Sequence, residues 1–315
     1  MKEPQDQKDL NKETPIVSNN EVVTLENLPS FEQHRPAALI RKINFMSPSE
    51  KDKNILADIT CDCFLERYQK HTGISEIGER FKTGFSFLSI EDFAKETEDE
   101  KACDNPGVFI IEKHHMFINK DRAKGEPDYD YTTFLHETYH FFSLENGAGF
   151  SLDSSMGFSY PEEVDTDEKL AELLSLGSES LCEGTTQALT AEMHQDMGFD
   201  FFNNTYVIES EFAKGIRSVV GEETFEKAFF TMPLEEIRLR FESLAVPDDK
   251  EIPEDYFNGA FSSFLIDLGG RVKYCNNIIS KYSDIDDTSE KDRNEIYAVI
   301  DEYLENLHEY IHQND

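Results

Sequence analysis

Apolar residues recur at helical spacing over most of this chain of 315 residues. The clearest pattern covers residues 131 to about 145, where Asn146-Gly147 supplies a helix stop. A second helical pattern covers residues 168–197 and ends at Gly198, with Gly177 as a candidate break inside it.

The remainder of the chain also has helical periodicity. Interruptions are expected at Gly221, at Pro233 and across residues 247–253, which begin and end with proline. The last segment carries apolar residues at helical spacing from Ile296 to Ile311. This stripe is typical of a helix that packs on a core rather than one that pairs with a partner.

The first part of the chain is less regular. Residues 37–45 form a short apolar segment that is expected to be a strand. A helix is predicted to open at residues 47–50, where a serine cap is combined with proline, and to stop at Gly73. Residues 107–112 and 115–119 are expected to form a hairpin.

These patterns predict an α+β fold that is mostly helical, with a small sheet preceding the helix of residues 131–145. Residues 1–30 are polar and are expected to form a disordered tail. Residues 31–250 are predicted to be the main domain, and residues 251–315 a helical segment packed on the same domain.

The net charge narrows the choice of partners. The chain has 30 Lys and Arg against 65 Asp and Glu, a formal charge of −35. A protein that binds nucleic acid must neutralise phosphates with basic residues, so nucleic acid is not an expected partner. The charge suits solubility and also a field that attracts basic peptides. No apolar run reaches the length of about 18 residues that a membrane span requires.

The cysteines are few and odd in number. The five cysteines do not form a disulfide framework, and this suits a reducing compartment. Cys61 and Cys63 resemble half of a metal knuckle, but the chain has no second pair to complete it, so both are expected to lie in a helix. The first residues lack the apolar core of a signal peptide. We therefore expect a cytoplasmic protein, with export by a specialised route as the alternative.

Residues 136–140 read His-Glu-Thr-Tyr-His. On a helix, His136 and His140 lie on one face, so both imidazoles can reach one metal ion. Glu137 lies to the side, where its carboxylate can take a proton from a water molecule at the metal. Zn²⁺ suits neutral nitrogen donors and keeps an open position in catalytic sites. The motif therefore predicts a zinc site with Glu137 as general base.

The motif is specific. From the composition of this chain it is expected by chance only about 0.03 times. It also lies inside a strongly apolar helical run, between Phe134-Leu135 and Phe141-Phe142. The alternative is a pair of histidines satisfied in a core helix, but burying two imidazoles and a carboxylate without partners is costly.

Two histidines leave one protein ligand to be found. Glu183 opens the segment Glu-Gly-Thr-Thr-Gln-Ala-Leu-Thr in the second long helix, and Glu179 lies one turn earlier on the same face. A glycine next to Glu183 removes a side chain where a helix or a substrate must come close. Glu183 and the competing Glu179 are therefore both candidates for the third ligand at this point.

Together the two motifs resemble zincin metallopeptidases of the gluzincin type, and most closely poorly characterised bacterial members. The resemblance covers roughly residues 107–235, while residues 1–100 and 250–315 match no family. It implies that His136, His140 and Glu183 bind Zn²⁺ and that Glu137 is the general base. This sequence has Gln187 where Glu is common in that group.

Three further residues are weaker candidates for contacts with substrate. Tyr160 and Tyr206 each carry a hydroxyl that can donate to an oxyanion, although packing is the competing role for both. His194 lies 11 residues after Glu183, roughly 16 Å along the helix, and is therefore too far away to share the metal. A surface or core role competes with substrate contact for this histidine.

The sequence thus predicts a zinc-dependent peptidase that acts on peptides or proteins. The loop of residues 147–167 joins the two ligand-bearing helices and is expected to line the cleft. Its acidic residues predict substrates with Lys or Arg near the scissile bond. They are Glu162, Glu163, Asp165 and Asp167, together with Glu168 directly after the loop. Two alternatives remain open: a non-catalytic zincin-like module that binds a protein, and a secreted bacterial effector protease.

Overall fold

The computed structural model divides the chain into residues 1–34 and one unit of residues 35–315. All the residues that the structure describes belong to the second unit. They are residues 36–71, 73–98, 104–145, 147–150, 168–199, 205–232, 237, 260–282 and 287–312. The tail predicted for residues 1–30 and most of the predicted cleft loop, residues 151–167, lie outside this part.

The described part is mostly helical and contains a small sheet, as the sequence predicts. No helix in this part is both long enough and apolar enough to cross a membrane. The α-helices are α1 (Ala37–Ile40), α2 (Glu50–Tyr68), α3 (Ile74–Phe81), α4 (Ile90–Thr97), α5 (Pro127–Leu144), α6 (Glu168–Asp196), α7 (Val207–Val220), α8 (Glu222–Thr231), α10 (Ala260–Ile279) and α11 (Glu290–Ile311). The strands are β1 (Phe85–Leu88), β2 (Gly107–Ile110) and β3 (His115–Asn119), and short 3₁₀ helices cover Ile111–Lys113 and Lys120–Arg122.

Within the described residues the sheet has the strand order β1-β3-β2, so β2 is an edge strand of this sheet. Strands β2 and β3 are antiparallel, with Val108 opposite Phe117, which confirms the predicted hairpin. Strand β1 runs parallel to β3, with Phe85 opposite Met116. The sequence patterns did not predict β1, because its pairing joins segments about thirty residues apart.

Residues 37–45 are not a strand, so this prediction is wrong. Ala37 to Ile40 form the short helix α1, and turns follow it. Ala37 and Ile40 are buried three positions apart, which is helical spacing. The backbone N–H of Ala37 donates to the carbonyl of Met197 beyond the end of α6. The segment therefore packs against the core as a short helix, next to the end of α6.

Helix α2 begins as predicted but ends earlier. Its cap is Ser49, which exchanges hydrogen bonds with Asp52 in a capping box. The helix ends at Tyr68, before the expected stop at Gly73. Gly73 instead precedes α3, with a φ of 86° that favours glycine.

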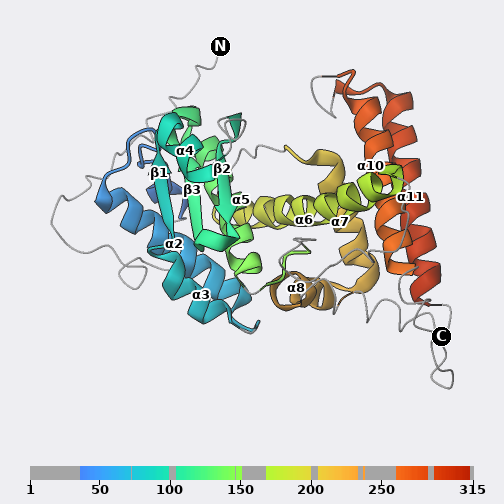
Figure 1. The fold of residues 1–315 in the computed structure, drawn as a ribbon, viewed down its shortest axis with the longest axis horizontal. Coiled ribbons are helices and arrows are strands. Elements are labelled where there is room, and N and C mark those ends of the chain that lie inside the picture. Colours follow the sequence, from blue (N-terminus) through green and yellow to red (C-terminus); the bar gives the residue numbers. More distant parts are fainter. Residues whose placement is uncertain are drawn as a thin grey trace, which may run out of the picture. The chain divides into compact units, whose positions relative to one another are not determined.

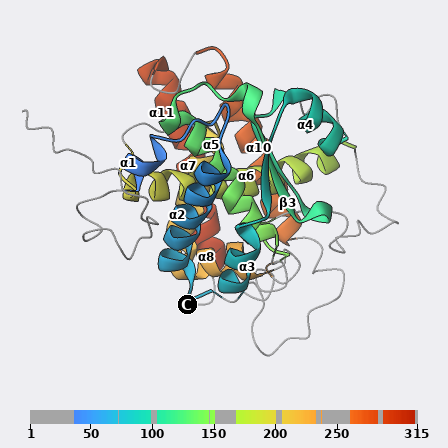
Figure 2. The same cartoon turned by 90° about the vertical axis from the view of Figure 1, so that its left-hand side faces the viewer.

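Helix α5 carries the His-Glu-Thr-Tyr-His motif and lies in the aromatic core. Phe134 and Tyr139 are completely buried, and Phe142 stacks on Phe64 of α2 with ring centroids 4.3 Å apart. Figure 2 shows α2 and α3 in front of α5 when the cartoon is viewed from this side. The helix starts at Pro127, four residues before the predicted start, because proline is favoured in a first helical turn. This packing holds the motif on a rigid element.

The first half of α6 crosses α10, and its second half packs against α5 (Figure 1). The predicted break at Gly177 is absent, because α6 is continuous. A Cβ at Gly177 would lie 1.9 Å from the carbonyl oxygen of Leu265 in α10, and one at Gly269 would lie 2.1 Å from that of Leu173. Glycine is thus needed for the close crossing of α6 and α10 and does not interrupt the helix.

Candidate metal centre

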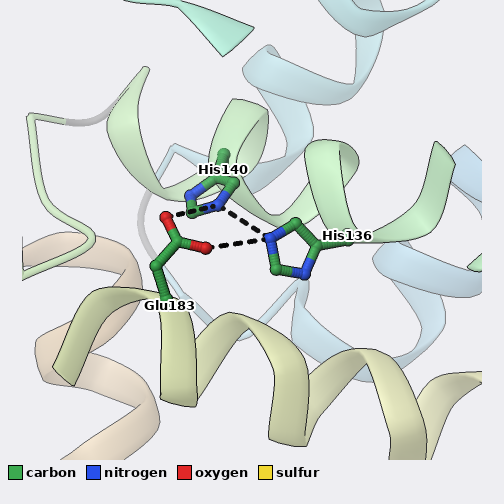
Figure 3. A group of neighbouring side chains, drawn as sticks. All are labelled: His136, His140 and Glu183. Atoms are coloured by element: carbon green, nitrogen blue, oxygen red, sulfur yellow. Dashed lines mark hydrogen bonds and ion pairs between the residues drawn. The ribbon is translucent and has the colours of Figure 1, made fainter. Parts of the chain in front are cut away.

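His136, His140 and Glu183 converge on one point (Figure 3). One potential ligand atom from each side chain lies within 4.8 Å of the other two. The histidines project from α5 one turn apart, and Glu183 reaches them from α6. In the described part of the chain, this is the one group of three or more His, Cys, Asp or Glu residues with such spacing.

The separations between the donor atoms suit a tetrahedral ion. The Nε2 atoms of His136 and His140 are 3.2 Å apart. Oε2 of Glu183 lies 3.0 Å from His136 Nε2, and its Oε1 lies 3.3 Å from His140 Nε2. Donors bound to zinc at about 2.0–2.1 Å in tetrahedral geometry are separated by about 3.3 Å. The spacing of the three side chains is therefore compatible with a zinc ion.

A second layer of side chains orients the imidazoles. His136 Nδ1 donates to Gln187 Oε1 at 3.0 Å, which leaves its Nε2 lone pair directed at the centre. His140 Nδ1 lies 3.9 Å from the buried sulfur of Cys182, and its Nε2 faces the same centre. With both imidazoles neutral, two lone pairs and a carboxylate meet with no proton between them. Such a set of acceptors can bind a metal cation.

The pKa values of His140 and Glu183 show how strongly the two side chains interact. Burial disfavours the charged form of His140, but the Glu183 carboxylate outweighs this and raises its pKa well above the ordinary value. Burial also opposes the charged form of Glu183, but His140 and His136 outweigh it and hold the pKa of this carboxyl below its usual range. The centre therefore favours positive charge, from a proton or from a metal ion.

Glu137 is not one of the converging ligands and lies against the edge strand β2. Its carboxylate accepts a hydrogen bond from the backbone N–H of Phe109. A Cβ at Gly107 would lie 2.6 Å from Glu137 Cγ, so only glycine leaves room for this side chain. Burial raises the pKa of Glu137, and the two motif histidines partly oppose this. The packing of Gly107 on Glu137 was not predicted from the sequence.

Gly184 has a comparable role on α6. A Cβ at this position would lie 2.2 Å from the carbonyl oxygen of Glu209 in α7. The glycine next to Glu183 therefore serves the approach of a helix, which is one of the two explanations that the sequence offered.

The converging side chains line a cleft of about 670 Å³. One wall is formed by β2 and the residues before it, and the others by α5, by α6 and by the residues before α7. The lining residues are Asn105, Pro106, Gly107, Val108, Phe109, Tyr129, Thr132, Thr133, His136, Glu137, His140, Leu144, Ser175, Ser178, Glu179, Cys182, Glu183, Gln187, Thr205 and Tyr206.

The weaker candidates fall in different places. Tyr206 lines the cleft and stacks on His136, with ring centroids 5.7 Å apart. Burial and then nearby carboxylates, led by Glu183, raise its pKa, so the hydroxyl remains a hydrogen-bond donor. His194 lies outside the cleft, buried beside Thr132 and stacked on Phe199 at 4.1 Å. Burial lowers its pKa to about 4, which fits a neutral core histidine and not a substrate contact.

The sequence points to Glu179 as a competing metal ligand and to an acidic loop as part of the cleft, and the structure describes only the first of these. Glu179 lines the cleft but does not belong to the converging group, so the geometry favours Glu183 as the ligand. Tyr160 and the acidic residues Glu162, Glu163, Asp165 and Asp167 lie outside the described residues, as does the side chain of Glu168.

Gln187 offers a test of the second layer. Replacing it with Met removes the acceptor for His136 Nδ1, and changes to such partners typically lower metal affinity about 10- to 100-fold. Competition titration with a chromophoric chelator measures this loss. Gln195→Met is the matched control, because Gln195 is exposed near the end of the same helix. Equal zinc affinities in the two variants would show that Gln187 does not orient the ligand.

Comparisons with models of protein families, with curated proteins and with solved structures found no match to this chain.

Proposed function

We propose that this chain is a zinc-dependent peptidase. The observation that carries the proposal is the convergence of His136, His140 and Glu183 with Glu137 beside them and outside the ligand set. A purely structural metal site has no use for a buried carboxylate that does not bind the ion. The resemblance of the two motifs to gluzincin metallopeptidases agrees with this arrangement.

The chemistry divides between the ion and the side chains. Zinc supplies Lewis-acid activation of a carbonyl group and of water. His136, His140 and Glu183 hold the ion, while Gln187 and Cys182 fix the ring orientations of the two histidines. Glu137 accepts a proton from water and returns it to the nitrogen that leaves when the peptide bond breaks. Burial raises the pKa of the Glu137 carboxyl toward neutral pH. A group whose pKa lies nearer the working pH both accepts and returns a proton more efficiently.

The edge strand β2 favours a peptide as the substrate. Pro106 accepts a hydrogen bond from Asn119, so the polar groups of alternate residues after it, Val108 and Ile110, also face β3. The backbone N–H and C=O groups of Gly107 and Phe109 therefore point away from β3. The hydrogen bond that Phe109 N–H donates to the Glu137 carboxylate agrees with this, because it is formed on the side of β2 that faces away from the sheet. An extended peptide can pair with Gly107 in the cleft, in the manner of an added strand.

Tyr206 completes the proposed site. Its ring covers one face of His136, and its hydroxyl remains protonated in this environment. A donor in this position can stabilise the negative charge that develops on the carbonyl oxygen during attack. The non-catalytic module lacks a comparable explanation for Glu137 and Tyr206. Export as a bacterial effector and a cytoplasmic location both stay predictions.

Metal removal tests the proposed function. Protein stripped with a chelator should lose cleavage of an unbiased peptide library, and about one equivalent of Zn²⁺ per chain should restore it. Elemental analysis before and after reconstitution measures the metal. Cleavage that persists after zinc has been removed would contradict the proposal. A fully zinc-loaded chain that cleaves nothing, with the first 30 residues present or deleted, would favour the binding module.

A further inference from the structure

Glu179 differs from the other acidic side chains of α6. Glu172 pairs with Lys273, and Glu192 pairs with Arg67 and Arg217. Asp196 also pairs with Arg67, and Glu183 contacts the two motif histidines. Among the acids of α6 whose side chains the structure describes, Glu179 has no hydrogen bond or ion pair with any described residue. It is exposed to solvent, and it lines the cleft.

The charges of the cleft leave Glu179 uncompensated. A divalent ion with two neutral imidazoles, Glu183 and Glu137 has a total charge of about zero. Neither Lys nor Arg is among the described residues that line the cleft. Glu179 therefore gives the loaded cleft a net negative charge one helical turn, about 6 Å along the axis, from the ligand Glu183.

The carboxylates near Glu179 add to the negative potential at this side chain. Partial burial of the carboxyl, then Glu183 and Glu209, raise its pKa, and none of these causes stabilises its charged form. The Glu209 carboxylate accepts a hydrogen bond from the neutral amide of Asn276 and is not balanced by that contact. A cation that enters the cleft would be attracted by both carboxylates.

We infer that Glu179 binds a cationic group of the substrate, an ammonium or a guanidinium, and thereby selects peptides that carry this group near the bond that is cut. The inference rests on the proposed peptidase function and adds the substrate class. The cation can come from a Lys or Arg side chain or from the free amino terminus of the peptide, because both present N–H donors to a carboxylate.

Matched peptides test the inference. Lys is moved through the three positions on each side of the scissile bond of a neutral peptide and compared with norleucine, which has the same length without the charge. Each peptide is made with a free and with an acetylated amino terminus. At one position, kcat/KM should rise about five- to tenfold for Lys, the range expected for a partly exposed charged contact, and the gain should shrink at high salt.

Three variants assign the effect to Glu179. In Glu179→Gln the ratio of Lys to norleucine should fall toward one, and in Glu179→Lys an acidic residue at that position should be preferred. Glu172→Gln is the matched control, because Glu172 lies two turns earlier on the same helix and outside the cleft. Loss of the gain on acetylation alone would identify the amino terminus as the source.

Binding separates failure of this inference from failure of the proposed function. Zinc-loaded Glu137→Gln and the double variant with Glu179→Gln are titrated with fluorescent forms of the same peptides, and anisotropy gives Kd without any cleavage. The preference for a cation should appear in the first and disappear in the second. An equal preference in both would overturn the role of Glu179, whether or not the wild-type chain cleaves peptides.

Discussion

Glu137→Gln should retain zinc and a native fold but lose at least about a hundredfold in the rate of peptide cleavage, because general bases typically contribute about 10²- to 10⁴-fold. The substitution keeps the size of the side chain. The amide oxygen of glutamine can still accept the hydrogen bond from Phe109 N–H, so the contact with β2 is preserved. What the variant loses is the ability to take a proton from water.

Three measurements isolate this effect. Zinc content and thermal unfolding establish that the site and the fold are intact, and peptide digestion then gives the rate. Glu126→Gln is a suitable control, since Glu126 is exposed and precedes the first turn of α5, outside the cleft. Cleavage by Glu137→Gln at the wild-type rate would remove the proposed mechanism even if zinc proved essential.

The local parts of the fold were predictable from sequence. The hairpin of β2 and β3 and the long helices α5 and α6 depend on patterns within short windows, and the structure confirms these elements. The motif histidines follow from helical spacing alone, because residues four apart lie on one face. The choice of Glu183 over Glu179 required the second motif, and the structure brings Glu183 to the histidines.

The features that escaped prediction depend on contacts between distant segments. Strand β1 exists because it pairs with β3, and its four residues have no strong pattern of their own. Gly177 was expected to break α6, but its role is set by Leu265 of α10, almost ninety residues away. Composition cannot reveal such crossings, since the same glycine is compatible with a break and with close packing.

The second layer of the site was hidden for the same reason. Cys182 precedes Glu183, and Gln187 follows it by one turn, so both lie near the ligand in sequence. Their contacts with the histidines of α5 exist only once α5 and α6 are packed together. The contact of Gly107 with Glu137 likewise joins β2 to α5. A search of positions flanking a candidate ligand would have found Gln187, but not Gly107.

Replacement of the ligands should abolish zinc binding and thereby separate Glu183 from Glu179. The wild-type chain should contain about one Zn²⁺, and His136→Ala or His140→Ala should lose most of it, because two protein ligands do not retain zinc at a catalytic site. Glu183→Ala should lower zinc affinity strongly. Glu179→Ala should not, since its carboxylate lies outside the converging group.

The comparison of the two glutamates is the sharpest part of this experiment, because both lie on α6 and both line the cleft. Chelator competition gives the affinity of each variant, and circular dichroism reports whether α6 remains helical. Loss of zinc in Glu179→Ala but not in Glu183→Ala would move the ligand one turn along the helix and remove the basis for a cation subsite at Glu179. Small and equal losses would place the third ligand on another segment, with the acidic run of residues 162–168 as the first to be replaced. Full zinc content in His140→Ala would show that the metal lies elsewhere, and the assignment of this cleft as a peptidase site would then fail.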